Sequence, residues 1–162
     1  METRADPDMP IPSDADEQPV GRWCAAALLI HDGRYLMQLR DAKPTILLPD
    51  HWGLFGGTVE PGEDAMAAMR RELAEELEWR PPDLAAFTEM TVWLPLDPPR
   101  LDRMSFFIAQ ATAADLAAMV QHEGADKRLF ETEALAREKR VAPWDLAAVL
   151  MHAREAALFG RG

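Results

Sequence analysis

The chain has 162 residues, 48% of them hydrophobic, and its 28 acidic residues outnumber its 17 lysines and arginines to give a net charge of −11. This size and apolar content predict one compact domain, and the acidic balance argues against a nucleic-acid duplex as partner, because nonspecific affinity for DNA comes from basic residues. No apolar run is long enough to span a membrane and the first residues are acidic, so we expect a soluble, cytoplasmic protein.

Residues 1–20 form a proline-rich, acidic segment. Pro7, Pro10, Pro12 and Pro19 stand among acidic residues with few apolar side chains between them. Such a composition buries too little apolar surface to fold by itself. We therefore expect a flexible N-terminal arm over residues 1–20 and a single folded domain over residues 21–162.

The folded domain is predicted to begin with a β-hairpin. An apolar run over residues 22–31 is followed by Asp32-Gly33 and by a second run over residues 34–40. Asp-Gly between two such runs is a strong signal for a hairpin turn. Residues 41–51 contain two prolines and are expected to form a loop that flanks the substrate.

A glycine-rich turn and a helix follow. Gly56 and Gly57 come directly after the apolar residues 52–55. Without a Cβ atom, these glycines let the backbone take a positive φ and approach a ligand closely. Asp64 is a suitable N-cap for a helix that begins after Glu63. The sequence therefore predicts a turn that is rigidly joined to a helix.

This helix carries Glu72, Glu75 and Glu76, whose spacing of i, i+3 and i+4 places them on one side. Like charges at this spacing destabilise a helix by roughly 0.2–0.5 kcal/mol per pair, so they need a neutralising partner or a fully solvated face. Mg²⁺ is a suitable partner, because it is usually held by a few carboxylates together with substrate phosphates. A solvated acidic surface is the alternative.

The remaining elements alternate between strands and helices. Pro81-Pro82 ends the acidic helix. We predict strands over residues 84–96 and 104–111 joined by a turn over 97–100, a helix or a strand over 113–120, a strand over 127–130, a helical turn over 132–137 and an amphipathic helix over 142–158. Strands with one helix inserted among them and another at the end predict an α+β fold.

The turn and the acidic helix together resemble the Nudix box of the Nudix hydrolases, G-x5-E-x7-R-E-U-x-E-E-x-G-U, where U is apolar. The matching residues are Gly57, Glu63 and the run Arg71-Glu72-Leu73-Ala74-Glu75-Glu76. Glu78 departs from the pattern, because it stands where the box has its last glycine. A glycine there supplies a left-handed helix cap that Glu adopts less readily, so the departure bears on the helix terminus. The resemblance implies the Nudix fold, an α/β/α sandwich with a mixed β-sheet between helices.

The resemblance also implies the site residues. It implies that Glu72, Glu75 and Glu76 bind Mg²⁺ or Mn²⁺ together with the backbone carbonyl of Gly56, and that Arg71 and Glu63 orient the site. The general base stays open between the box helix, with Glu72 and Glu76, and a loop near the last strand, where Glu123 precedes Gly124. For substrate contacts we expect Gly57, Arg40 and Trp52, with a surface arginine and a core tryptophan as the alternatives.

The function implied by the resemblance is hydrolysis of a diphosphate linkage by water attack on phosphorus. The substrate would be a small-molecule nucleoside diphosphate derivative, either a nucleoside triphosphate, ordinary or oxidised, or a nucleotide sugar. The alternative is a Nudix-like module that binds or senses a nucleotide with little turnover. A homodimer is one possible assembly.

Overall fold

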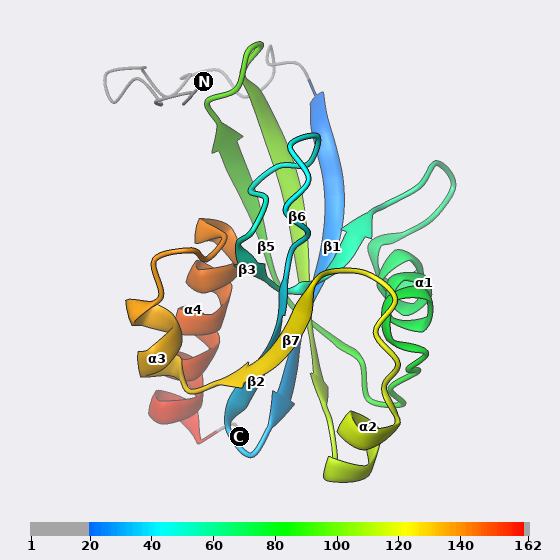
Figure 1. Ribbon diagram of the computed structural model, residues 1–162, viewed down its shortest axis with the longest axis vertical. Helices are drawn as coiled ribbons and strands as arrows, with labels where there is room; N and C mark the ends of the chain where they lie inside the picture. Colours follow the sequence, from blue (N-terminus) through cyan, green and yellow to red (C-terminus); the bar gives the residue numbers. More distant parts are fainter. Residues whose placement is uncertain (1–19, 161–162) are drawn as a thin grey trace.

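The computed structural model describes residues 20–160, so the arm predicted for residues 1–20 lies, apart from Val20, outside the described residues. A seven-stranded sheet lies between helices on its two faces (Figure 1). The elements in chain order are β1 (Val20–His31), β2 (Arg34–Leu39), β3 (Trp52–Gly53), β4 (Phe55–Thr58), α1 (Ala65–Leu77), β5 (Ala85–Leu94), β6 (Arg100–Gln110), α2 (Ala113–Ala118), β7 (Asp126–Phe130), α3 (Thr132–Arg137) and α4 (Pro143–Phe159). No helix among these residues is long and apolar enough to cross a membrane.

The sheet is mixed. Its main path runs β3-β2-β1-β6-β5, with β4 paired to β1 and β7 paired to β2. β1 and β6 are parallel, whereas the other paired strands are antiparallel. Helix α1 lies on one side of the sheet and α3 and α4 lie on the other (Figure 1). The predicted α+β sandwich with a mixed sheet is therefore confirmed.

Strand β1 contributes to both cores because it is covered on both faces. Its odd-numbered residues, such as Ala27 and Leu29, are buried in the same cluster as Leu73 of α1. Its even-numbered residues, such as Leu28, are buried in the cluster that contains Val149 of α4. Side chains alternate across a strand, so a strand that is buried on both faces is apolar almost throughout. This explains the unbroken apolar run at residues 25–30.

The predicted hairpin and the start of the acidic helix are confirmed. Asp32 and Gly33 have φ values of 48° and 72°, which are the two positive values that a type I′ hairpin turn requires. The Oδ1 atom of Asp64 accepts a hydrogen bond of 2.7 Å from the N–H of Ala67, so Asp64 caps α1 as expected. The turn and the helix are thus joined as predicted.

The structure corrects the boundary of one predicted turn and shows which of two alternatives holds for residues 113–120. The predicted turn at residues 97–100 ends one residue too late, because Arg100 already belongs to β6 and pairs with Leu94 of β5. The segment 113–120, for which helix and strand were both open, forms the helix α2. Thr112 and Asp115 make a reciprocal capping box at its start, which stabilises a helix that is only six residues long.

Glu78 forms the C-terminal cap of α1 in a left-handed conformation, with φ of 52°. Its N–H donates to the carbonyl of Ala74 at 3.1 Å, and the N–H of Trp79 donates to the carbonyl of Leu73 at 3.3 Å. The bond from Glu78 to Ala74 is the one that defines the αL capping motif, which usually uses glycine at this position. The helix therefore ends as the Nudix box predicts, although Glu stands in place of Gly.

Candidate functional site

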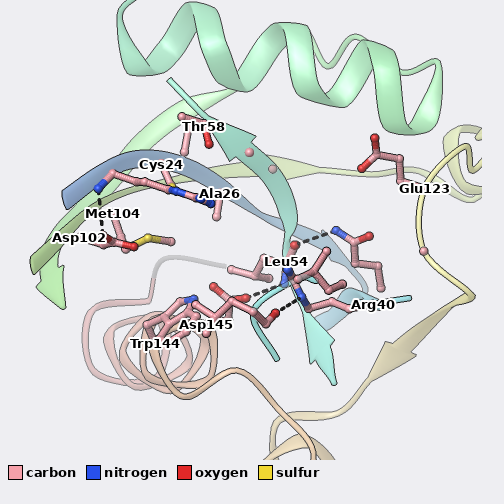
Figure 2. Close-up of a pocket in the computed structure, with 18 of the residues that line it drawn as sticks. Cys24, Ala26, Arg40, Leu54, Thr58, Asp102, Met104, Glu123, Trp144 and Asp145 are labelled. Atoms are coloured by element: carbon pink, nitrogen blue, oxygen red, sulfur yellow. Dashed lines mark hydrogen bonds between the residues drawn. The ribbon is translucent and has the colours of Figure 1, made fainter. Parts of the chain in front are cut away.

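A cavity of about 830 Å³ is the main candidate site. Its walls come from strands β1, β2, β4 and β6, from the loops around residues 41–47 and 122–124, and from the start of α4. Figure 2 shows Glu123 on one side of this cavity, Asp102 and Met104 on the opposite side, and Trp144 and Asp145 between them. Segments far apart in the chain therefore meet here.

Two glycines set the wall next to α1. Gly56 has φ of 146°, and a Cβ atom there would lie 2.0 Å from the carbonyl oxygen of Ala25 on the paired strand β1. At Gly57, a Cβ atom would lie 2.4 Å from Oε1 of Glu72. Glycine is therefore required at Gly56 for the backbone conformation and the strand contact, whereas at Gly57 a Cβ atom would displace the carboxylate of Glu72.

Glu76 is the most deeply buried carboxylate of α1. Its residue surface is only 2% exposed, and Oε2 accepts a hydrogen bond of 2.9 Å from the N–H of Gly56. Burial, followed by the charges of Glu72 and Glu123, raises the pKa of the Glu76 carboxyl to about 8. Burial also raises the pKa of Glu72. Two acids with unfavourable ionisation therefore lie beside the glycine turn.

Arg71 connects the turn with the helix. Its guanidinium donates to both oxygens of Glu63 at 2.9 and 3.0 Å, to Glu72 at 2.7 Å, to Glu75 at 3.3 Å and to the carbonyl of Thr58 at 3.0 Å. The hydrogen bonds from Arg71 lower the pKa of Glu63. Arg71 and Glu63 thus link the turn to α1, and their orienting role stays a prediction.

The acidic residues suit a divalent cation in their chemistry. Within residues 20–160, no group of three His, Cys, Asp or Glu side chains is close enough together to hold a metal ion as the side chains stand. Glu75 has a side chain that is 60% exposed, and Arg71 bonds to both Glu72 and Glu75. Carboxylate oxygens are nevertheless the ligands that Mg²⁺ and Mn²⁺ prefer, and burial raises the pKa of both Glu72 and Glu76. The assignment of Glu72, Glu75 and Glu76 as ligands of such an ion therefore stays a prediction.

The loop that carries Glu123 lies across the cavity from the glycine turn. It is held at both sides, because the N–H of His122 donates to the carbonyl of Glu76 at 2.9 Å and the N–H of Ala125 donates to the carbonyl of Leu39 at 2.8 Å. Gly124 has φ of 84°, which favours glycine. The structure thus brings Glu123 and Glu76 to the same cavity, from segments about fifty residues apart.

Of the two predicted side-chain contacts to substrate, one lines the cavity. Arg40 lies in its wall, and its Nε donates to the carbonyl of Leu47 at 3.1 Å. Trp52 does not line the cavity: it is 4% exposed, packs edge-on against Phe130 at 4.9 Å between ring centroids, and has the guanidinium of Arg128 over its ring at 5.0 Å. This position favours the core alternative for Trp52.

Sequence reasoning missed Asp145 at the start of α4. Asp145 is 6% exposed and lines the cavity, and its Oδ2 accepts a hydrogen bond of 2.9 Å from the N–H of Leu54. The other oxygen, Oδ1, is buried and has no hydrogen-bond partner within residues 20–160. Burial raises the pKa of Asp145 to about 7. The only signal in the sequence is a single acid within the apolar stretch of residues 141–151.

The far wall of the cavity was missed as well. Asp102 on β6 is 5% exposed and accepts hydrogen bonds from the guanidinium of Arg100 at 2.8 and 3.1 Å and from the backbone N–H of Arg22 at 2.9 Å. Cys24 and Met104 lie beside it in the same wall. This wall depends on the parallel pairing of β1 with β6, which joins residues about eighty positions apart.

Comparisons with known proteins agree with this geometry. A family model for the NUDIX domain matches residues 21–151. The nucleoside triphosphatase NudI of Escherichia coli O1:K1 / APEC is 39% identical over 72 residues, which are 44% of this chain and 48% of NudI. The chain thus spans about half the length of the curated relatives it matches.

Solved structures match over most of the chain. The MutT protein of Methanosarcina mazei Go1 matches with a TM-score of 0.67 at 20% identity, over 86% of this chain and 96% of that one. The Escherichia coli dihydroneopterin triphosphate pyrophosphohydrolase matches with 0.66 at 19%, over 85% and 100%. The NUDIX domain of Shewanella oneidensis NrtR, solved with ADP ribose, matches with 0.65 at 18%, over 90% and 93%. At these identities the similarity shows a shared fold alone. Because the NUDIX model covers most of the chain and the described site contains its glycine turn and carboxylate helix, the chain belongs to the Nudix family.

Proposed function

We propose that the chain hydrolyses a phosphoric anhydride bond in a nucleoside triphosphate or another nucleoside diphosphate derivative, with Mg²⁺ or Mn²⁺ as cofactor. The observation that supports this most directly is the meeting of Glu76, Glu123 and the backbone of Gly56 and Gly57 at one cavity. A metal ion bound by Glu72, Glu75 and Glu76 would neutralise phosphate oxygens and lower the pKa of an attacking water. Glu123 or a box carboxylate would accept the proton from that water.

The chain's own residues would keep the diphosphate in place. The glycine turn leaves its backbone uncovered by Cβ atoms, so phosphate oxygens can approach it. Arg71 bonds to four neighbours of the turn and helix, which keeps the carboxylates oriented. Arg40 supplies a guanidinium in the same cavity, which suits a phosphate oxygen.

We further propose that the moiety attached to the diphosphate lies toward Asp145 and Trp144. Both residues line the cavity away from the Glu123 side (Figure 2). The buried Oδ1 atom of Asp145 lacks a partner among the described residues, and leaving a buried polar atom unpaired costs about 1–3 kcal/mol. A nucleobase N–H or amino group would supply the missing donor. The similarity to the nucleoside triphosphatase NudI makes a nucleoside triphosphate the first substrate to test.

The test is a substrate panel with product identification. Nucleoside triphosphates, oxidised triphosphates, ADP-ribose and nucleotide sugars are each incubated with Mg²⁺ and with Mn²⁺, and the phosphate and nucleotide products are separated. We expect metal-dependent turnover of at least one class by the native chain and by Glu89→Gln, since Glu89 of β5 pairs with Arg103 of β6 outside the proposed site. Silence of the whole panel, with a nucleotide still raising the melting temperature, would support a nucleotide-binding module instead.

A further inference from the structure

Glu78, the residue that departs from the Nudix box, makes a contact that glycine cannot make. Its Oε1 atom lies 2.6 Å from Nε2 of His122. His122 belongs to the loop between α2 and β7, lines the cavity and directly precedes Glu123. The side chain at the end of α1 therefore reaches the loop that carries the other acid of the site.

The same loop is also bound through its backbone. The N–H of Val120 donates to the carbonyl of Leu77 at 3.1 Å, and the N–H of His122 donates to the carbonyl of Glu76 at 2.9 Å. These carbonyls belong to the last turn of α1, where helix carbonyls have no partner within the helix. The C-terminal turn of α1 is thus a support for the loop, and the contact between Glu78 and His122 adds a side-chain link to it.

The position of this loop matters for the carboxylates. Glu123 is exposed and lines the same cavity as Glu76 of α1. A shift of the loop would therefore change the distance from Glu123 to the helix carboxylates and to any substrate between them.

We infer that Glu78 and His122 form a positioning pair that holds the Glu123 loop against α1, so that the residue replacing the box glycine acts on the site through Glu123. The functional part of this inference rests on the proposed hydrolysis. The pair is about half exposed, with side chains that are 57% and 47% exposed. Exposed pairs contribute little to stability, so the effect belongs in loop order and turnover and not in the melting temperature.

Glu78→Gly is the decisive variant, because it restores the residue that the cap conformation favours while it removes the contact. We expect its melting temperature to be equal to or higher than that of the native chain. Amide hydrogen exchange should become faster at residues 120–125. With a substrate from the panel, kcat should fall between about threefold and about tenfold, as expected for loss of one orienting hydrogen bond, while KM changes less than twofold.

Three further variants separate positioning from other effects. His122→Ala should behave like Glu78→Gly. Glu78→Gln, which keeps an oxygen for His122, should retain most of the native kcat. In a Glu123→Gln background, Glu78→Gly should leave kcat unchanged, since its effect passes through Glu123. Glu89→Ala, which removes an equally exposed pair on β5 and β6, should change neither exchange at residues 120–125 nor kcat.

The outcomes distinguish this inference from the proposed function. Unchanged exchange at residues 120–125 in Glu78→Gly would overturn the inference whether or not a substrate is found. An equal loss of kcat in the native and Glu123→Gln backgrounds would overturn the role through Glu123. If no panel substrate is turned over, the proposed hydrolysis fails, and hydrogen exchange alone then decides whether the pair holds the loop.

Discussion

Replacing Asp145 by Asn is expected to stabilise the ligand-free protein at alkaline pH. Burial raises the pKa of the Asp145 carboxyl from 3.8 to about 7, so the folded state favours the protonated form. The unfolded chain ionises Asp145 above pH 3.8, whereas the folded chain resists this ionisation. The stability from the protonated carboxyl is therefore fully present below about pH 3.8, decreases as the pH rises, and is lost above about pH 7.

The size of the effect follows from the shift. A shift of about three pKa units corresponds to an upper bound of about 4 kcal/mol at pH 8, and about 2.5 kcal/mol of this arises between pH 5 and pH 8. In Asp145→Asn, the side-chain oxygen can still accept from the N–H of Leu54, and the amide never ionises. The difference in unfolding free energy between variant and native chain should therefore grow with pH by up to this amount.

Urea unfolding at pH 5 and at pH 8, without metal or nucleotide, measures this difference. Glu133→Gln, which removes an exposed carboxylate of α3, serves as the control and should show no change with pH. Glu76 also has a raised pKa, but it is present in all three proteins and cancels from the comparison. A difference between Asp145→Asn and the native chain that stays constant between pH 5 and pH 8 would refute the buried, proton-holding state of Asp145.

The glycine turn and the helix carboxylates yield three more predictions. Glu76→Gln should lower kcat by at least about a hundredfold and abolish stabilisation by Mg²⁺, while the metal-free protein stays folded by circular dichroism. Gly57→Ala should weaken Mn²⁺ binding in a calorimetric titration by about tenfold or more, because the new Cβ atom would lie 2.4 Å from Oε1 of Glu72 and would displace that carboxylate. Unchanged binding would argue against Glu72 as a ligand. Arg71→Lys should reduce kcat/KM by about tenfold with little change in melting temperature, since lysine cannot bind both oxygens of Glu63, and a variant with native kcat/KM would contradict the orienting role.

The parts of the site that sequence predicts are those whose residues are close together in the chain. The turn at Gly56 and Gly57 and the carboxylates of α1 are about twenty residues apart, and their spacing fixes which side of the helix faces the turn. Asp64 as a cap and Asp32-Gly33 as a hairpin turn are likewise local. These elements depend on backbone rules that act within a few residues.

The parts that sequence does not predict depend on distant pairing. Asp145 is buried against the N–H of Leu54, which lies 91 positions earlier in the chain, so the local sequence gives no sign of this contact. The burial of Trp52 follows from contact with Phe130 on β7, which pairs with β2 and not with a neighbour in sequence. Nothing in the local pattern around residues 52 or 145 distinguishes a cavity wall from a core.

This division also explains why the Nudix box indicates a reaction class but not a substrate. At one end of the cavity, the glycine turn and Glu76 come from one contiguous segment and therefore appear in the sequence as a motif, whereas Arg40 and Glu123 come from other segments. The opposite end combines Met104 of β6, Cys24 of β1 and Trp144 of α4, which meet only through the parallel pairing of β1 with β6 and the packing of α4 on the sheet. Substitutions there can change which group is bound without altering the box. A substrate prediction for this chain must therefore start from Asp145 and its surroundings, because this end of the cavity holds a buried polar atom that has no partner within residues 20–160.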